Sequence, residues 1–369
     1  MTAAVAFGRL RQASVHLDGQ LLLAILALSG VGLVVLYSAS NESLIDLQRQ
    51  GMRLGIGLLA LIVIAQISPS TLQRWTPAVF GLAFTALLLV PLIGVTSMGA
   101  QRWLDLGVFR FQPSELMKLA VPMAVAWILS QQPLPPRLLP TLIAVLVILA
   151  STALIAMQPD LGTAILVLSS GFFVLFLAGL RWRYLIVAAV SALLAAPAYW
   201  QFLMHDYQRA RILTLLDPQR DPLGSGYHII QSSIAIGSGG LYGKGWLNST
   251  QARLDFLPES NTDFIFAVFS EEFGLTGGLL LLALYLFIIV RGMVIALHAQ
   301  SAYGRLLAGA LSLTFFVYVA VNIGMVAGLL PVVGVPLPLI SYGGTSMVTI
   351  MAAFGILMSI HTHRRLWSA

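Results

Sequence analysis

Ten long apolar runs, separated by short polar connections, make up most of this chain. A helix of about 20 apolar residues crosses a bilayer, because the hydrocarbon core is about 30 Å thick and a helix rises about 1.5 Å per residue. A helix also pairs its own backbone N–H and C=O groups, which find no hydrogen-bond partners in lipid. The sequence therefore predicts an all-α polytopic membrane protein with about ten transmembrane helices. The predicted spans are 21–37, 52–68, 76–95, 114–130, 139–157, 162–180, 184–203, 264–290, 305–330 and 344–360.

The composition agrees with this fold class. Apolar residues make up 58% of the 369 residues, charged residues only 9%, and the mean hydropathy is +0.90. The net charge of +6 comes from Lys and Arg residues scattered singly between apolar runs, so it indicates anionic lipid as a partner and not nucleic acid. The absence of cysteine excludes thiol chemistry, disulfides and thiolate metal sites.

The chain reads as one membrane domain over residues 1–369, with one long polar connection at about 204–262. The first apolar run precedes Ser38-Ala39-Ser40, which loosely resembles a signal-peptidase site. The run exceeds a signal-peptide core of roughly 7 to 15 residues, so we interpret it as an uncleaved first span.

The distribution of basic residues predicts the orientation. An even number of spans places both termini on one side of the membrane. The short connections on that side carry ten arginines, whereas those on the opposite side carry five basic residues. Basic residues concentrate in cytoplasmic connections, so we expect cytoplasmic termini and an extracytoplasmic 204–262 connection. Of the fourteen Asp and Glu residues only Asp18 falls on the cytoplasmic side. The two sets are Arg9, Arg11, Arg74, Arg137, Arg181, Arg183, Arg291, Arg305, Arg364 and Arg365, against Arg49, Arg53, Arg102, Arg110 and Lys118.

Charged residues within or beside spans are costly, and each is a candidate for function. Glu115 and Lys118, three residues apart, share a helix face that starts at Pro113-Ser114. They form either an ion pair that neutralises itself in lipid or, with Arg102, a cationic site for an anionic head group. Asp160, in the turn between two spans, is equally explained as a helix cap or a functional carboxylate.

Asp263 opens the span that follows the long connection. It is either a helix cap or a general base at the lipid–water border. Glu271 and Glu272 are predicted to lie roughly 12 Å deeper, at about 1.5 Å per residue, which is too deep for a sugar and suits packing or pairing inside the bundle.

Glycine and proline are dense between Asn322 and Ser346, where they break helix within an apolar region. This stretch, ending Ser341-Tyr342-Gly343-Gly344-Thr345-Ser346, resembles the signature of the RodA/FtsW/SpoVE family. The resemblance covers nearly the whole chain. It extends through Gly99-Ala100-Gln101-Arg102-Trp103, Gln112-Pro113-Ser114-Glu115, Gln158-Pro159-Asp160-Leu161-Gly162-Thr163, Gly237-Ser238-Gly239-Gly240 and Phe256-Leu257-Pro258-Glu259.

The resemblance implies a bacterial inner-membrane enzyme that polymerises peptidoglycan from lipid II on the periplasmic side, releasing undecaprenyl pyrophosphate. It implies that Asp263 is catalytic and that a class B penicillin-binding protein, with other elongation proteins, is the partner. Three segments look like the elongation branch of the family more than the division branch, which would have the same chemistry. They are His205-Asp206-Tyr207-Gln208-Arg209, Asp217-Pro218 and His361-Thr362-His363-Arg364.

Such a reaction needs a base to deprotonate the acceptor hydroxyl, and Asp263 is the candidate. Pyrophosphate is a good leaving group, so cations are needed in place of a paired acid, and Arg102 and Lys118 are the candidates. No metal cluster is visible, and the sequence leaves open a divalent ion such as Mg or Mn on the pyrophosphate. The alternatives are a lipid II flippase, which would need a polar path into the cytoplasmic half, and a scaffold.

Overall fold

The computed structural model describes residues 16–97, 100–105, 107, 110–221, 224–254, 256–257 and 259–363. Gly99 and Pro258 of the quoted motifs lie outside these residues, and so do four of the arginines that predict the orientation. The four are Arg9, Arg11, Arg364 and Arg365. The described helices are α1 (Gly19–Ala39), α2 (Leu44–Ala65), α3 (Pro69–Ile93), α4 (Pro113–Ser130), α5 (Leu138–Met157), α6 (Leu161–Leu177), α7 (Trp182–Ala198), α8 (Asp206–Leu216), α9 (Ser225–Ser238), α10 (Thr250–Arg253), α11 (Ile265–Leu297), α12 (Ala302–Val326) and α13 (Thr345–Thr362).

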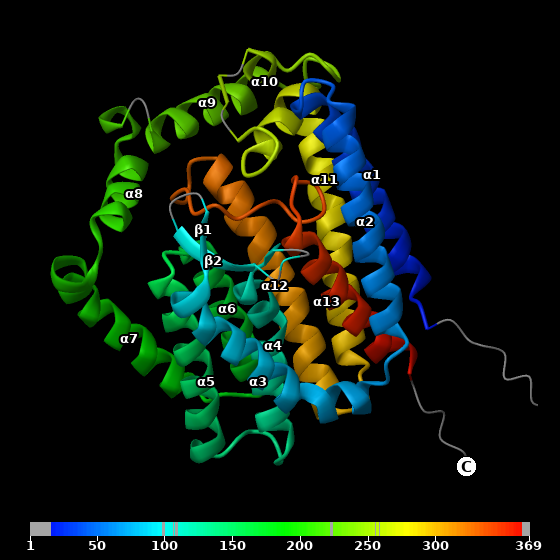
Figure 1. The fold of residues 1–369 in the computed structure, drawn as a ribbon, viewed down its shortest axis with the longest axis vertical. Helices are drawn as coiled ribbons and strands as arrows, with labels where there is room; N and C mark the ends of the chain where they lie inside the picture. Colours follow the sequence, from blue (N-terminus) through cyan, green and yellow to red (C-terminus); the bar gives the residue numbers. More distant parts are fainter. Residues whose placement is uncertain are drawn as a thin grey trace, which may run out of the picture.

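The structure is a helical bundle organised around α12, which packs against α4, α6 and α11, while α13 packs against α2 (Figure 1). Within the described residues, eight helices are long and apolar enough to span a membrane. They are α1, α2, α3, α5, α7 together with the π-helical turn η2 (Tyr199–Leu203), α11, α12 and α13. Helix α6 is shorter, with 17 residues, and α4 carries Glu115 and Lys118. The all-α membrane fold is confirmed, and the count of ten crossings stays a prediction.

Both ends of the described chain lie at one end of the bundle. The rings of His16 and His363 stack with their centroids 3.9 Å apart. Asp18 caps α1 by accepting from Gln20 N at 3.1 Å, and it also forms an ion pair with Arg291 at 2.8 Å. We refer to this as the terminal end, and to the opposite end, where α9 and α10 lie, as the outer end (Figure 1).

The 204–262 connection, which we call the outer connection, is folded. It contains α8, α9 and α10 and a 3-10 turn, η3 (Pro218–Arg220), and α9 packs against α11. Hydrogen bonds tie it to the transmembrane helices: Trp246 Nε1 donates to Val34 O at 3.2 Å, and Arg253 Nη2 to Glu42 Oε1 at 2.9 Å. The connection therefore lies on the outer ends of α1 and α2.

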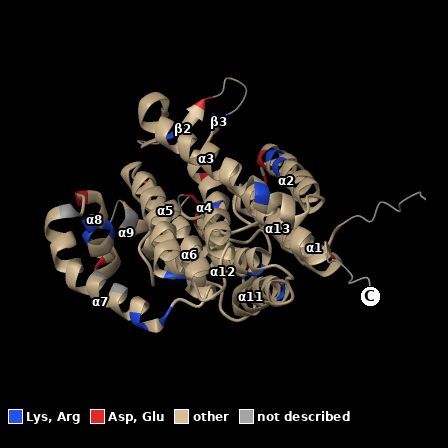
Figure 2. Cartoon of the chain, turned by 90° about the horizontal axis from the view of Figure 1, so that it is seen from below, with Lys and Arg blue, Asp and Glu red and all other residues tan. Residues whose placement is uncertain are grey.

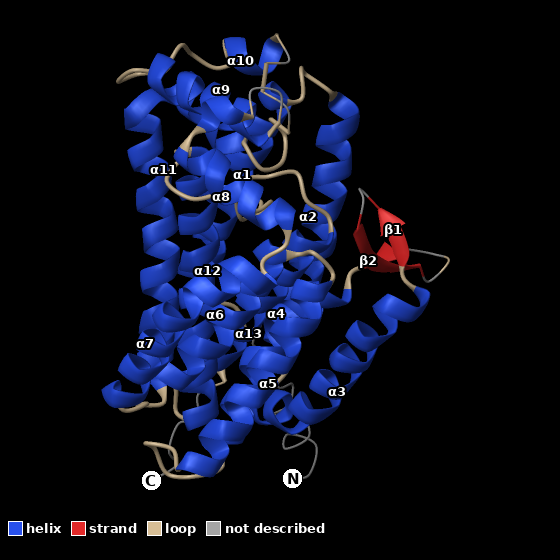
Figure 3. Ribbon diagram, turned by 90° about the vertical axis from the view of Figure 1, so that its left-hand side faces the viewer, coloured by secondary structure: helices blue, strands red, loops and turns tan. Residues whose placement is uncertain are grey.

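A small antiparallel sheet, which the sequence did not predict, lies between α3 and α4. Strands β1 (Val95–Ser97), β2 (Ala100–Asp105) and β3 (Arg110–Phe111) follow one another in the order β1-β2-β3. Val95 pairs with Trp103, and Leu104 pairs with Phe111. Figure 3 shows the sheet at the edge of the bundle beside α3. Its short strands lack the long alternating pattern by which a strand is recognised from sequence.

Helix α11 is interrupted at Gly274, where φ is +63° and ψ is −162°. A side chain is strained at this φ, and a Cβ there would lie 2.4 Å from Gly243 N. The segment before the break, from Ile265, lies against the outer connection: Lys244 N donates to Glu271 O at 2.9 Å, and Gly245 N to Glu272 O at 3.0 Å.

This break corrects the predicted depth of the two adjacent glutamates. The side chain of Glu272 accepts a short hydrogen bond from Ser38 Oγ, at the outer end of α1. The prediction that Glu271 and Glu272 lie deeper in the membrane than Asp263 is therefore wrong, whereas both side chains are buried and paired, as expected. It assumed that the chain runs inward from Asp263 along one straight helix, whereas the segment before Gly274 runs to the outer end and only the segment after the break crosses the bundle.

Candidate functional site

The backbone around Asp263 is held by residues far away in the sequence. Asn322 Nδ2, on α12, donates to Asp263 O at 2.9 Å and to Val335 O at 2.8 Å. Ser341 Oγ donates to Thr262 O at 2.6 Å. These contacts come from the glycine- and proline-rich connection between α12 and α13 and from the helix before it, so that the irregular segment predicted from the sequence forms a cradle for this turn.

The carboxylate of Asp263 is not a helix cap. The N-cap position of α11 belongs to Phe264, with no side-chain cap hydrogen bond. Among the described residues, no group donates a hydrogen bond to this carboxylate or forms an ion pair with it. Gly334 faces it, and a Cβ there would lie 3.5 Å from Asp263 Oδ2. The side chain is therefore available to a ligand.

The surroundings of Asp263 favour its protonated form. Burial, followed by the negative charge of Glu259, raises the pKa of Asp263 from 3.8 to about 6, and Arg211 acts in the opposite direction. Glu259 is itself engaged, since Thr262 Oγ1 donates to Glu259 Oε2 at 2.6 Å. A carboxyl group that titrates near neutral pH is suited to accept and release a proton.

Arg211, on α8, is a functional candidate that the sequence reading missed. Burial lowers its pKa, and the charges of Arg102, Asp160 and Asp263 also act on it. Its guanidinium carbon lies 5.8 Å from the ring centroid of Tyr207, and no described group forms a hydrogen bond or ion pair with it. Only its position in a polar connection would have pointed to it, and many arginines share that signal.

Arg102 and Asp160 both hold the turn between α5 and α6. Arg102 Nε donates to Gln158 O at 3.0 Å, and its Nη2 donates to Pro159 O at 2.6 Å. Asp160 caps α6 by accepting from Thr163 N at 3.2 Å, and its other oxygen accepts from Gln112 Nε2 at 3.0 Å. The cap alternative for Asp160 is therefore confirmed, and part of the Arg102 guanidinium is committed to the backbone.

The α5–α6 turn also meets the cradle of Asp263. A Cβ at Gly162, two residues after Asp160, would lie 2.8 Å from Val333 O, next to Gly334. Gly334 faces Asp263, and its neighbour Val333 contacts Gly162. The turn that carries Asp160 and the segment that carries Asp263 therefore both contact residues 333–334. The structure thus brings Asp263, Asp160, Arg102 and Arg211 into one region.

Glu115 and Lys118 form a separate buried pair. Lys118 Nζ lies 2.6 Å from Glu115 Oε1, and the two side chains are 5% and 7% exposed. The same ammonium lies 5.2 Å from the ring centroid of Tyr318, on α12. No described contact joins this pair to Asp263. The ion-pair alternative is therefore present in the structure, and binding of an anionic head group by Lys118 stays a prediction.

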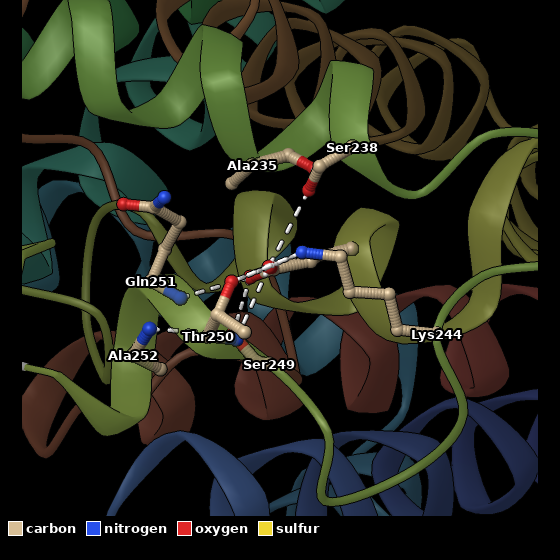
Figure 4. Close-up of polar contacts among 8 residues, drawn as sticks. Ala235, Ser238, Lys244, Ser249, Thr250, Gln251 and Ala252 are labelled. Carbon is tan, nitrogen blue, oxygen red and sulfur yellow. Dashed lines mark hydrogen bonds and ion pairs between the residues drawn. The ribbon is translucent and has the colours of Figure 1, made fainter.

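Glu271 anchors the outer connection through hydrogen bonds from several residues, of which Figure 4 labels Lys244, Ser249 and Thr250. Its fully buried carboxylate accepts from Lys244 Nζ at 2.6 Å, Ser249 Oγ at 2.6 Å and Thr250 Oγ1 at 2.6 Å. The backbone amides of Thr250 and Gln251 donate to it as well. This set of donors satisfies both oxygens, so Glu271 has a structural role and is not available as a second base.

Comparison with known proteins supplies a further finding. The family model for FtsW/RodA/SpoVE cell-cycle proteins matches residues 19–366. The chain is 55% identical to peptidoglycan glycosyltransferase MrdB of Escherichia coli K12, over 96% of each chain. It is 36% identical to stage V sporulation protein E of Bacillus subtilis 168, over 94% of this chain and 98% of that one.

Solved structures agree. A chain of a peptidoglycan synthase complex, studied for its coordination of polymerization and crosslinking, superposes with a TM-score of 0.82 at 34% identity and covers 94% of this chain and 97% of that one. The rod shape determining protein RodA of Thermus thermophilus gives a TM-score of 0.72 at 30% identity, covering 95% and 98%.

Proposed function

This chain belongs to the FtsW/RodA/SpoVE family and is a peptidoglycan glycosyltransferase, and we propose that Asp263 is the general base with which it polymerises lipid II. The observation that carries the proposal is the carboxylate of Asp263. Its backbone is fixed by Asn322 and Ser341, its side chain has no described partner, and its pKa lies near 6. A rigidly placed, uncommitted carboxylate of this kind is what proton abstraction requires.

The reaction joins two sugars. A hydroxyl oxygen of the acceptor attacks the anomeric carbon of the donor, the bond from that carbon to pyrophosphate breaks, and the configuration inverts. The hydroxyl proton passes to Asp263, and the electron pair of the broken bond leaves with undecaprenyl pyrophosphate. Because the leaving group departs as an anion, no second carboxylic acid is needed to protonate it, unlike in glycoside hydrolysis.

Cations are required for the departing pyrophosphate. We propose Arg211 for this role, together with the part of Arg102 that is not committed to Gln158 and Pro159. Lys118 would have to leave Glu115 or act with it as a neutral pair, so its contribution is indirect.

A divalent ion would find few ligands on the protein. The described residues contain no group of three or more His, Asp or Glu side chains that could hold one. Mg²⁺ is commonly held by one or two carboxylates together with substrate phosphates, and Asp263 is the free carboxylate of this region. A metal ion, Mg or Mn, would therefore arrive with the pyrophosphate and supply charge neutralisation there.

We place the protein in the bacterial inner membrane, with the terminal end cytoplasmic and Asp263 on the periplasmic side. The arginines of the terminal-end connections support this orientation. We also propose a class B penicillin-binding protein as partner, within the elongation complex. The support is the likeness to a chain of a peptidoglycan synthase complex and the higher identity to MrdB than to the sporulation protein.

The test uses the purified full chain with lipid II in detergent, with and without the cognate penicillin-binding protein, and glycan strands separated by gel electrophoresis. Asp263→Asn keeps the size of the side chain and the hydrogen bond to the backbone carbonyl but cannot accept the proton, so glycan synthesis should fall by roughly 100-fold to 10,000-fold. Asp206→Asn is the matched control, because Asp206 is fully exposed on α8 and should polymerise normally.

Near wild-type synthesis by Asp263→Asn would remove Asp263 as the base and direct the search to Asp160 and then Glu115. Movement of lipid II across vesicle membranes without glycan formation would instead support the flippase alternative.

A further inference from the structure

A cavity of about 730 Å³ lies between α5, α6 and α7, at the terminal end of the bundle and away from Asp263. Its neighbours place it at that end. The cavity lining begins at Pro135, five residues after α4 ends at Ser130. Gln73 Nε2, at the start of α3, lies 3.4 Å from Ser130 Oγ. Ser359, near the end of α13, bonds the same region at Ile67 O. Figures 1 and 2 show α7 at the edge of the bundle beside α5 and α6.

The walls of this cavity are apolar and face lipid. They include Leu142, Leu168 and Phe172, which are 54%, 40% and 40% exposed in the protein alone. None of the side chains that the structure describes in the membrane-spanning part of α7 is buried, so this helix leaves the cavity open along the bundle surface. Pockets of roughly 300 to 1,000 Å³ enclose a ligand of drug size, and this one has room for a stretch of hydrocarbon chain.

The mouth of the cavity is basic. Arg137 and Arg181 line it, and neither forms a side-chain hydrogen bond or an ion pair with the described residues. The cavity lining contains no acidic residue. The two arginines come from neighbouring connections, since a Cβ at Gly179 would lie 3.6 Å from Pro135 Cβ. Two arginines without an acidic partner among the described residues therefore lie at one end of an apolar cavity.

Two aromatic residues indicate how deep in the membrane this basic end of the cavity lies. Tyr184 lines the cavity and Trp182 begins α7, and they are 41% and 70% exposed. Tyrosine and tryptophan at the ends of spans lie at the level of lipid head groups. Figure 2, viewed from this end, shows Lys and Arg segments where α7 begins. The arginines thus lie where a lipid phosphate would lie.

We propose that this cavity binds an anionic glycerophospholipid of the cytoplasmic leaflet, with its phosphate on Arg137 and Arg181 and an acyl chain between α5, α6 and α7. Basic pockets between transmembrane helices on the cytoplasmic side recognise such head groups. The proposal concerns a surface at the opposite end from Asp263, and it does not depend on the glycosyl-transfer proposal.

The experiment measures lipid retention by native mass spectrometry. The purified full chain in detergent is titrated with phosphatidylglycerol and, separately, with phosphatidylcholine of the same acyl chains. Near the surface each arginine contributes about 1 kcal/mol towards an anionic lipid, so the wild type should prefer phosphatidylglycerol by roughly tenfold or more. This comparison of two lipids on the wild type needs no variant and so does not depend on a variant's folding.

Arg137→Gln/Arg181→Gln should abolish the preference. The matched control is Arg74→Gln/Arg305→Gln, which removes the same charge from two exposed arginines at the same end and should keep it. Equal retention of both lipids by the wild type, or an unchanged preference in the cavity variant, would overturn the proposal. Displacement of phosphatidylglycerol by undecaprenyl phosphate at equal concentration would also overturn it, by assigning the cavity to an isoprenoid chain.

Discussion

Asn322 and Asp263 are joined by a 2.9 Å hydrogen bond from the side-chain amide of the first to the backbone carbonyl of the second. The same nitrogen also donates to Val335 O, so one buried amide connects the turn that carries the carboxylate to the irregular segment that faces it. The carboxylate itself is left without a protein partner. Its position is therefore fixed through the backbone, while its oxygens stay free for chemistry.

Replacing Asn322 tests this positioning. Asn322→Ala leaves the carbonyls of Asp263 and Val335, the first partly and the second fully buried, without this donor, which costs about 1 to 3 kcal/mol of stability and displaces Asp263. A displacement of about 1 Å can reduce the rate by roughly 100-fold. We expect a lower kcat with lipid II binding retained. Unchanged kcat in a variant that still folds would show that the hydrogen bond does not position the base.

The pH dependence of polymerisation should follow Asp263. The base acts only when ionised, so the rate should rise with pH and reach half its plateau near the pKa of about 6. Arg211 favours the ionised form, and Arg211→Gln should therefore move the midpoint to higher pH as well as weaken substrate binding. A pH profile of single-turnover rates measures both, and a midpoint below pH 5 in the wild type would contradict the assignment.

The same raised pKa has an effect on stability. The folded state binds the Asp263 proton more tightly than the unfolded state does, so this contribution is present at low pH and is lost as pH rises from 3.8 through about 6. Asp263→Asn cannot ionise, and its melting temperature above pH 7 should equal or exceed that of the wild type.

Lys118 and Glu115 should behave as a unit. Lys118→Met leaves the Glu115 carboxylate buried without its cation, which is costly, whereas Lys118→Met/Glu115→Gln removes both charges. If the pair is structural, the double variant should recover both accumulation in the membrane and glycan synthesis. If Lys118 serves the substrate, the double variant should accumulate and stay inactive.

The outer connection should depend on Glu271. Glu271→Gln removes the charge at the centre of the hydrogen bonds from Lys244, Ser249 and Thr250, and we expect a loss of about 1 to 3 kcal/mol in unfolding free energy, read as a lower melting temperature. Lys244→Met is the milder control, because the Lys244 side chain is 31% exposed. Equal effects of the two variants would argue against Glu271 as the anchor.

The orientation can be read with reporter fusions. A fusion after Trp367 should behave as cytoplasmic and one near Ser225 as periplasmic, because basic residues favour the cytoplasmic side. The reverse pattern would place Asp263 on the cytoplasmic side, away from the growing wall.

Local rules predicted much of this structure. The helices follow the apolar runs, Asp160 caps α6, and Glu115 pairs with Lys118 at a spacing of three residues. The cap and the ion pair depend on residues within one turn of helix and the spans on one continuous run of residues, all of which a single sequence displays directly.

The failures have a different origin. The break at Gly274 depends on the close approach of Gly243, and the buried donors of Glu271 come from residues about 20 to 30 positions earlier. Arg211 became a candidate only when α8 brought it towards Asp263. Contacts between segments distant in sequence leave no periodic pattern in either segment, and they decided which of the charged residues surround the site.

With Asp263 as the proposed base, its cradle also implies a point during synthesis before which the enzyme cannot be active. The chain is made from its N-terminus, so Asp263 leaves the ribosome before Asn322 and Ser341 exist. Ser341 in turn accepts at its carbonyl from Gln50 Nε2, on α2, at 3.0 Å, which joins one of the first helices made to one of the last segments. A nascent chain that ends after α11 therefore contains the proposed base and most of its helices but not Asn322 or Ser341, and we expect such a chain to be inactive until the last helices are made.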